Sequence, residues 1–224
     1  MTDAGPSADF FESQGLRLHY ADWGNTGAPP LVLVHGGRDH GRSWDTLARA
    51  LAPHFHVVAP DLRGHGDSEW AKGSSYSLAD YVYDLSRLVA HLELERVILV
   101  GHSMGGMVSL VYAGTFPARV ARLAVLDGIV TYPGRAAPPI HEQIARWIGE
   151  LDAIAARKPR RLASIGEGAA RMAAHNKRLT SEQASLLAGH GLRPQPDGGF
   201  AWKFDEYQAV RAPYRLSPED YAAL

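Results

Sequence analysis

The stretch that decides the fold of this chain is RVILVGHSMGGMV, at positions Arg96–Val108. Val97–Val100 is a run of four apolar, mostly β-branched residues, which is typical of a central parallel strand covered on both faces. Gly101 and Gly105 stand two positions before and after Ser103, where a strand turns abruptly into a helix only if the neighbouring side chains are almost absent. The pattern therefore predicts a strand, a tight turn that holds out the Ser103 hydroxyl, and a helix.

Backbone N–H groups close to this turn could bind a negatively charged oxygen. The N–H of Met104 lies at the start of the expected helix, where an anion is stabilised. The apolar run Leu31–Val34 reads as a second buried strand and ends at His35-Gly36-Gly37. Open α/β sheets bind ligands at the carboxyl ends of their strands, and two glycines there let backbone N–H groups face a ligand.

Three segments together resemble a known family. Leu31–Gly37, Asp61–Ser68 and Arg96–Val108 follow one another in the order and approximate spacing of the α/β-hydrolase fold family, in its lid-bearing branch of esterases, lipases and related serine hydrolases. The similarity runs from about Leu16 to Tyr214. It implies an α/β fold with a mostly parallel sheet flanked by helices, an inserted helical lid, and Ser103 as the nucleophile.

The resemblance also assigns roles around the serine. It implies that the N–H of Gly37 is the second oxyanion donor beside that of Met104, although an ordinary glycine turn is the alternative for Gly37. His35 and His102 are structural by the same resemblance. Asp61 and Arg63 are likewise assigned to structure, and we expect them to form an ion pair that fixes their loop.

A serine hydroxyl needs a base, normally a histidine held by a carboxylate. Asp127, at the end of the expected strand Leu123–Asp127, is the candidate acid, and a loop-capping aspartate is the alternative. The family's histidine follows its last strand, but no histidine lies beyond His190 in this sequence. His141, His175 and His190 fall in the expected lid, where a surface or packing role is favoured, and none of them is assigned as the base.

The predicted organisation follows from these segments. Residues 1–127 form the hydrolase core with strands one to six, residues 128–216 the helical lid, and residues 217–224 the start of a truncated return to the core. Ser217-Pro218-Glu219-Asp220 is a helix-start signal close to the end of the sequence. The resemblance places two more strands and the histidine loop beyond it. We therefore expect an incomplete hydrolase that is nearly inactive alone, unless a second chain completes the sheet or a lid histidine substitutes.

Two further elements are predicted locally. The alternating run Phe10–Gly24 turns at Gly15 and reads as a hairpin at the sheet edge. Ser77 and Asp80 form a capping-box pattern before a helical apolar stripe that leads to the serine segment.

Composition excludes several classes of function. The chain has 224 residues, 46% hydrophobic and 21% charged, with a net charge of −1, which fits one globular core and argues against nucleic acid. Arg157–Arg161 is the one basic run and is expected to be a solvated turn. The absence of cysteine excludes disulfides and Cys-based zinc sites. Neither a dinucleotide fingerprint nor a Walker motif is present, so no cofactor or metal is expected. Met1–Asp9 lacks a signal-peptide pattern, so we expect a cytoplasmic protein with no membrane partner.

The functional prediction is a cofactor-free serine hydrolase that cleaves an ester or related acyl bond of a small to medium apolar substrate. The alternatives are a non-catalytic ligand-binding protein or inactive fragment on the same fold, or a carbon–carbon bond hydrolase. Epoxide hydrolases and haloalkane dehalogenases are disfavoured, because their turns present an aspartate where Ser103 stands. The expected partner is a small-molecule substrate, with a homo-oligomer possible.

Overall fold

The structure of the 224-residue chain is a computed structural model. It describes residues 5–73, 76–128, 138–158, 160–210, 212–213 and 216–224. The residues directly after the predicted core boundary at 127–128, and Tyr214 at the end of the family resemblance, lie outside the described residues.

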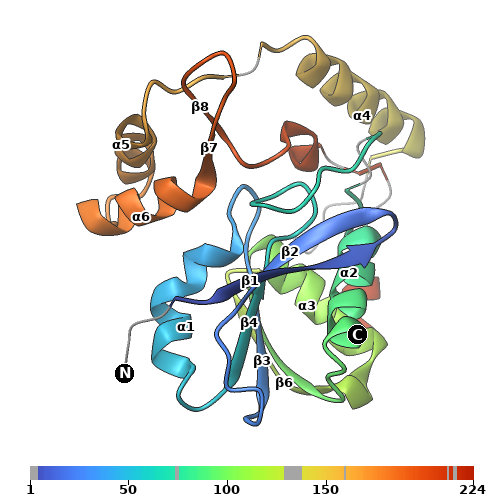
Figure 1. The fold of residues 1–224 in the computed structure, drawn as a ribbon. Helices are drawn as coiled ribbons and strands as arrows, with labels where there is room; N and C mark the ends of the chain where they lie inside the picture. The colour runs from blue at the N-terminus through green and yellow to red at the C-terminus, as the bar shows by residue number, and fades with distance from the viewer. Residues whose placement is uncertain (1–4, 74–75, 129–137, 159, 211, 214–215) are drawn as a thin grey trace.

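One six-stranded sheet organises the first half of the chain (Figure 1). Its order is β1-β2-β4-β3-β5-β6; β1, β2 and β4 pair antiparallel, and β4, β3, β5 and β6 pair parallel. The strands are β1 (Ser7–Ser13), β2 (Leu16–Asp22), β3 (Pro30–Val34), β4 (His56–Pro60), β5 (Val97–His102) and β6 (Val120–Leu126). Leu31 pairs with Ile98, so the two apolar runs share one sheet, as predicted. The predicted α/β fold with a mostly parallel sheet is confirmed.

The predicted hairpin forms the antiparallel edge of this sheet. The seven residues of β1 pair with the seven of β2, and Gln14 and Gly15 make the turn with φ of 48° and 74°. Two residues at positive φ are what a tight two-residue hairpin turn requires.

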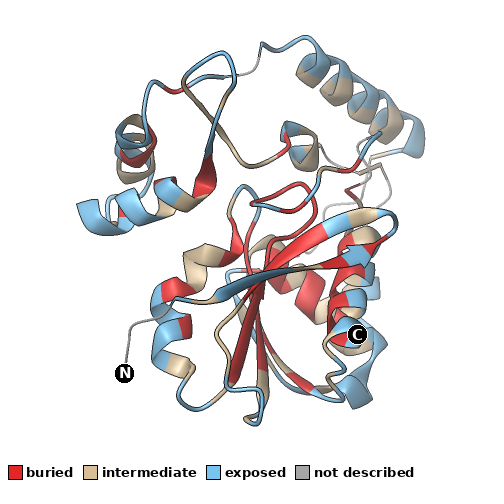
Figure 2. Cartoon of the chain, in the orientation of Figure 1, coloured by how far each residue is buried: buried red, intermediate tan, exposed pale blue. Residues whose placement is uncertain are grey.

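Helices cover both faces of the sheet. α1 (Asp45–Leu51), preceded by the 3₁₀ turn η1 (Gly41–Trp44), packs on one face over Leu31, Leu33 and Val57. α2 (Leu78–His91) and α3 (Met104–Thr115) cover the other face and enclose the larger core, which includes Val32, Leu88 and Leu99. Ser77 begins α2 with the predicted capping box. Figure 2 shows buried residues concentrated in the strands and in the helix sides that face them.

Strand β6 ends the sheet on the other side within the described residues. Leu123 packs into the larger core, whereas Ala124 and Leu126 are exposed. The turn η2 (Pro117–Arg119) precedes this strand. α7 (Pro218–Ala222) begins at the predicted helix-start signal, where Ser217 and Asp220 form a capping box. α7 leads the chain against α3, where the Tyr221 hydroxyl lies 3.8 Å from Met107 Sδ.

Residues 140–209, here termed the helical segment, lie above the sheet in Figure 1. They comprise α4 (Ile140–Ala155), α5 (Ile165–His175), α6 (Ser181–Gly191), β7 (Leu192–Pro194), β8 (Phe200–Trp202) and the 3₁₀ turn η3 (Glu206–Ala209). A small core of their own contains Leu162, Ala184 and Leu192. His40 Nε2 lies 3.1 Å from the Leu187 carbonyl oxygen, and His65 forms a β-bridge with Phe204. The helical segment therefore contacts the loops that follow β3 and β4.

The expected ion pair between Asp61 and Arg63 is wrong. Arg63 forms a bidentate pair with Asp84 of α2, with Nε and Nη2 each 2.6 Å from a carboxylate oxygen. Asp61 instead accepts hydrogen bonds from the Gly41 N–H at 2.6 Å and the Asp67 N–H at 2.8 Å. Arg63 and Gly64 occupy the central positions of a β-turn closed by the His65 N–H on the Leu62 carbonyl, with Gly64 at φ 74°, whereas Asp61 precedes this turn.

Candidate active site

Ser103 occupies the turn between β5 and α3 in a strained backbone conformation. Its φ is 51° and its ψ is −117°, a region that residues other than glycine rarely occupy. The Ser103 N–H donates to the Leu126 carbonyl at 2.9 Å, and the Ser103 carbonyl accepts from Gly106 at 3.0 Å and Met107 at 3.2 Å. The end of β6 and the first turn of α3 together hold the strained residue in place.

The surrounding glycines are required by close backbone approach. A Cβ on Gly101 would overlap the carbonyl oxygen of Gly105, and a Cβ on Gly105 would overlap the carbonyl oxygens of Val34 and His35. Because these neighbours are backbone atoms, no side-chain rotation could relieve the contact. The glycine spacing in the sequence thus reflects the packing of β3, β5 and α3 against one another.

The structure brings Ser103, Gly37 and Met104 to one place. The position that a Cβ would take on Gly36 lies 2.9 Å from His102 Nδ1 and 3.3 Å from Ser103 Cβ, so the Ser103 turn packs closely against Gly36. The corresponding position on Gly37 lies 4.0 Å from Met104 Sδ. All three candidate residues therefore border a common space at the carboxyl ends of β3 and β5.

His35 orients the peptide that carries the Gly37 N–H. Its Nε2 accepts from the Leu62 N–H at 2.9 Å, so the proton of the neutral ring is on Nδ1, which donates to the Gly36 carbonyl at 2.7 Å. Complete burial lowers the pKa of His35 and keeps the ring neutral. In a trans peptide the C=O and N–H point in opposite directions, so the Gly37 N–H points away from the buried imidazole. In the structure, His35 therefore acts by orienting the Gly36–Gly37 peptide.

Asp127 lies beside the turn but makes no catalytic contact in the described structure. It follows β6 with φ 52° and is exposed. The Cβ position of Gly128 is 2.8 Å from the Ser103 carbonyl oxygen, so the backbone at this point touches the strained turn. No histidine among the described residues hydrogen-bonds the Asp127 carboxylate. Its role as the triad acid stays a prediction.

All eleven histidines lie in the described ranges, and none of them hydrogen-bonds the Ser103 hydroxyl. His102, next to Ser103, is exposed; His141 and His175 are exposed on α4 and α5. His190 is directed to the start of α1, with Nε2 4.0 Å from Asp45. The described histidines thus supply no general base in contact with Ser103.

Two polar residues at the site escaped sequence analysis. The Oε1 atom of Gln208 lies 3.5 Å from the Cβ position of Gly37. His65 is fully buried, and its ring lies 5.1 Å from that of His35 in an edge-on arrangement. Gln208 belongs to a short 3₁₀ turn far along the chain, and no sequence pattern signals its return to the Gly37 loop.

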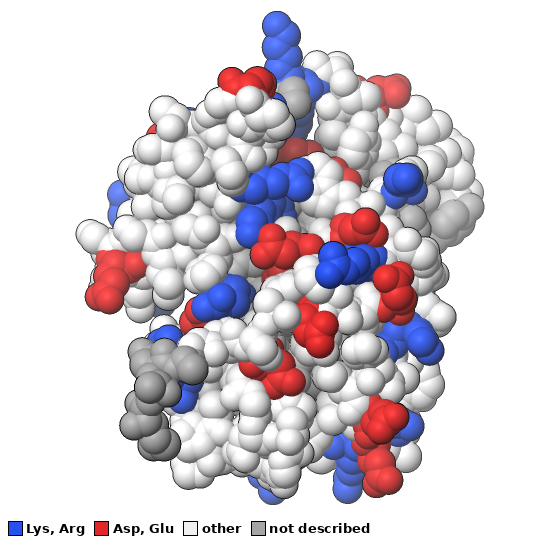
Figure 3. All heavy atoms as spheres, viewed as in Figure 1, with Lys and Arg blue, Asp and Glu red and all other residues white. Residues whose placement is uncertain are grey.

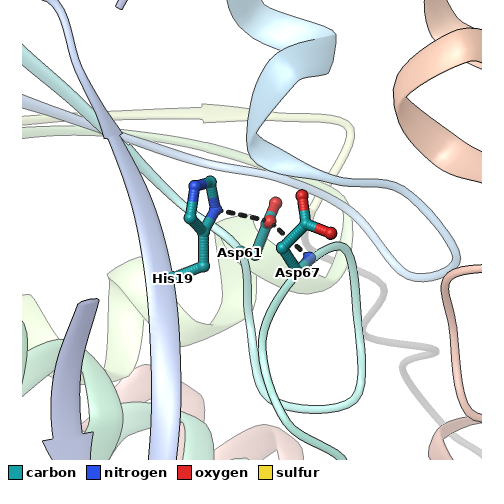
Figure 4. A group of neighbouring side chains, drawn as sticks. All are labelled: His19, Asp61 and Asp67. Carbon is teal, nitrogen blue, oxygen red and sulfur yellow. Dashed lines mark hydrogen bonds and ion pairs between the residues drawn. The ribbon is translucent and has the colours of Figure 1, made fainter. Parts of the chain in front are cut away.

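One cluster of a histidine and two aspartates has the composition of a metal site, but its side chains already pair with other protein groups. The ligand atoms of His19, Asp61 and Asp67 lie within 4.8 Å of one another (Figure 4). Burial alone would raise the pKa of Asp61, yet the hydrogen bond and charge of His19 hold that pKa well below its usual range. Asp67 pairs with Lys203 at 2.7 Å. The cluster is therefore an internal ion-pair network, since a metal would have to displace these partners.

Surface charge and helix composition bear on binding to nucleic acids and membranes. On the face in Figure 3, basic and acidic side chains are interspersed over the surface. None of the described helices combines the length and the apolar character needed to cross a membrane. That no nucleic acid binds stays a prediction.

Comparison with known proteins decides the family. Residues 29–164 match the family described as alpha/beta hydrolase fold. The chain belongs to this family. Among curated hydrolases, the 3-hydroxybutyrate-oligomer hydrolase of Cupriavidus necator is 34% identical over 214 residues, which cover 92% of this chain and 69% of that protein. The chain spans 33% to 55% of the length of several other curated relatives.

Solved structures of hydrolases and related proteins share the fold over nearly the whole chain. A hypothetical protein of Pseudomonas aeruginosa PAO1 superposes with a TM-score of 0.85 at 30% identity, covering 96% of this chain and 76% of that one. The thioesterase domain from the curacin biosynthetic pathway gives a TM-score of 0.83 at 25% identity, covering 94% and 73% of the two chains. The predicted family is thereby confirmed, and with it a general relationship to hydrolases.

Proposed function

We propose that this chain is a serine hydrolase that cleaves an ester or related acyl bond of a small to medium apolar substrate. The observation that carries the proposal is Ser103 at positive φ, packed closely against Gly36 and standing at the amino end of α3. Strained backbone conformations of this kind cluster at active sites. The arrangement offers a hydroxyl nucleophile and two backbone N–H groups in one space.

The proposed reaction proceeds through an acyl-serine. Ser103 Oγ attacks the carbonyl carbon while a general base accepts its proton, and the carbonyl oxygen takes up the negative charge. The N–H groups of Gly37 and Met104 donate to this oxyanion, an interaction typically worth about a hundredfold to a thousandfold in rate per donor. The C–O bond then breaks, the alkoxide leaves with the proton, and water hydrolyses the acyl-serine to restore Ser103. Asp127 is the proposed acid partner of the base.

The helical segment is proposed to act as a lid that supplies apolar walls. It contacts the loops after β3 and β4, and its helix α4 has no buried residue despite an apolar stripe formed by Ile144, Trp147, Ile148 and Leu151. An amphipathic helix with an unburied apolar side suits an apolar ligand.

Two relatives support acyl chemistry, although a third, from Mus musculus, is named epoxide hydrolase 4. The Cupriavidus necator relative is named as a hydrolase of 3-hydroxybutyrate oligomers, and the curacin protein is a thioesterase domain. By analogy, the proposed substrate is an ester of a short acyl group.

A serine-directed probe tests the proposal. Wild-type protein should be labelled by a fluorophosphonate, and Ser103→Ala should abolish both the label and any hydrolysis of p-nitrophenyl butyrate. Ser185→Ala, at an exposed serine on α6, is the matched control and should be labelled like wild type. Equal labelling of Ser103→Ala and wild type would remove Ser103 from the mechanism. A folded wild-type protein that binds esters without being labelled would support the non-catalytic alternative.

A further inference from the structure

Gln208 is held at the site by a rigid anchor. The residue before η3, Asp205, is buried; its backbone N–H donates to the Gly64 carbonyl at 2.8 Å, and its Oδ1 accepts from the Tyr207 N–H at 3.1 Å. Tyr76 donates to its Oδ2 at 2.6 Å. These bonds fix the turn that carries Gln208, so the position of this side chain beside Gly37 is determined by the fold.

The Gln208 amide lies between the Gly37 loop and the buried His65 ring. Its Oε1 is 3.5 Å from the Cβ position of Gly37, and the side chain is near enough to His65 to interact with the imidazole. His65 Nε2 is buried and has no hydrogen-bond partner among the described residues. The Gln208 amide is its polar neighbour on the side of the Gly37 loop.

The protonation of His65 decides which end of the amide it meets. His65 Nδ1 lies 2.9 Å from the Arg63 carbonyl, which only accepts, so Nδ1 carries the proton. Burial, and then the neighbouring His35, lower the pKa of His65 to about 3, so the ring is neutral at pH 7. Nε2 is then a bare acceptor. Of the two ends of the Gln208 amide, only the NH₂ group could pair with Nε2, and Oε1 lies on the Gly37 side.

We propose that Gln208 Oε1 is a substrate-binding acceptor and that it selects acyl groups that carry a hydroxyl close to the scissile carbonyl. The inference rests on the proposed function of the Ser103 site and names its substrate class. The carbonyl oxygen of an ester is itself an acceptor and is served by the N–H groups of Gly37 and Met104. Gln208 Oε1 needs a donor, and an unsubstituted acyl chain has none.

Selection follows from the cost of an unpaired acceptor. No donor among the described residues pairs with Gln208 Oε1, and closure of the site around an alkyl chain would strip it of water. A hydroxyl close to the scissile carbonyl restores the bond. Because Gln208 is half-buried rather than fully enclosed, we expect a preference of about tenfold to a hundredfold for the hydroxyacyl ester.

Turnover of two matched esters provides the first test. Wild-type protein should hydrolyse p-nitrophenyl 3-hydroxybutyrate with a kcat/KM about tenfold to a hundredfold above that for p-nitrophenyl butyrate. Gln208→Met, of similar size and without an amide, should reduce this ratio to about one, mainly by raising KM for the hydroxy ester. Gln195→Met, in the β7–β8 turn, is the matched control and should keep the wild-type ratio. An unchanged ratio in Gln208→Met would overturn the inference.

A binding measurement keeps the inference separate from the catalytic proposal. Ser103→Ala protein should bind methyl 3-hydroxybutyrate more tightly than methyl butyrate by a similar factor, as measured by NMR titration, and adding Gln208→Met should abolish the difference. If esters are not turned over but this binding preference is present, the proposed catalysis fails and the inference stands. Equal binding of the two methyl esters would refute the inference whether or not Ser103 is labelled.

Discussion

Tyr76 and Asp205 join the core to the helical segment by a 2.6 Å hydrogen bond from the tyrosine hydroxyl to Oδ2 of the carboxylate. The same hydroxyl accepts from the Ala71 N–H at 3.0 Å. Burial and then the bond to Asp205 raise the pKa of Tyr76, so the hydroxyl stays protonated throughout the physiological range. This pair fixes the loop before α2 to the residue that begins η3, and through η3 it sets the place of Gln208.

Removing this hydroxyl should loosen η3. Tyr76→Phe leaves the Ala71 N–H and the Asp205 carboxylate without their partner, which should lower the free energy of unfolding by about 1–3 kcal/mol. Hydrogen exchange followed by mass spectrometry should show faster exchange in residues 205–209. Tyr83→Phe, at an exposed tyrosine on α2, is the control and should change neither quantity. Unaltered exchange of the Tyr207 amide in Tyr76→Phe would contradict the anchoring role.

A single methyl group at Gly105 should disrupt the turn around Ser103. Gly105→Ala places a Cβ against the backbone oxygens of Val34 and His35, so β3 and α3 must separate. We expect a loss of more than about 3 kcal/mol of stability or failure to fold, as for other severe overpacking. Gly149→Ala, in α4, meets no atom within 4 Å and should stabilise its helix by about 0.5–1 kcal/mol. Urea unfolding compares the two, and similar midpoints would be inconsistent with the close packing described.

The parts of the fold that sequence analysis predicted are those fixed by local rules. The apolar run Val97–Val100 and the glycines around Ser103 determine a strand, a turn and a helix within a few residues. The hairpin at Gly15 and the capping box at Ser77 are local in the same way. Each of these depends on sterics or hydrogen bonds between residues that are neighbours in the chain, so pattern alone is sufficient.

The parts that sequence analysis missed depend on contacts between distant segments. Asp61 and Arg63 are two residues apart and of opposite charge, but Asp61 precedes the Leu62–His65 turn, Arg63 lies within it, and each finds a partner elsewhere in the fold. Gln208 reaches Gly37 only because Asp205 is anchored on the loop after β4. Neither arrangement produces a periodic pattern or a fixed residue spacing in the sequence, because tertiary packing selects the partners.

Acid should destabilise the protein through His65. The pKa of this histidine is about 3 in the folded chain, because burial disfavours its charged form, and about 6.5 when unfolded. Below pH 6.5 the unfolded chain binds a proton that the folded chain does not, so stability is fully present above that pH and falls as the pH drops toward 3. At pH 5 the loss from this one group is about 2 kcal/mol.

A variant at position 65 isolates this contribution. Urea unfolding of wild type and His65→Gln at pH 7 and pH 5 should show a fall in stability between the two pH values that is about 2 kcal/mol smaller in the variant. His54→Gln, in the exposed turn before β4, is the control and should retain the wild-type fall. An equal fall in His65→Gln would mean that the ring already accepts its proton near pH 6.5.

Breaking the buried Arg63–Asp84 ion pair should lower the free energy of unfolding far more than breaking an exposed ion pair. Arg63 is 1% exposed, and its guanidinium also donates to the side-chain oxygen Oε1 of Gln14 at 2.6 Å. Arg63→Met leaves the buried Asp84 without its counter-ion, which should lower the free energy of unfolding by about 3–5 kcal/mol at pH 7.

The double variant Arg63→Met, Asp84→Leu removes both charges and should recover most of this loss, because a buried pair often contributes little compared with well-packed apolar residues. Arg171→Met, which breaks the solvent-exposed pair with Glu167 on α5, should leave the free energy of unfolding nearly unchanged. Denaturant unfolding distinguishes the cases: a double variant as unstable as Arg63→Met alone would show that the arginine stabilises the loop through contacts other than its pair with Asp84.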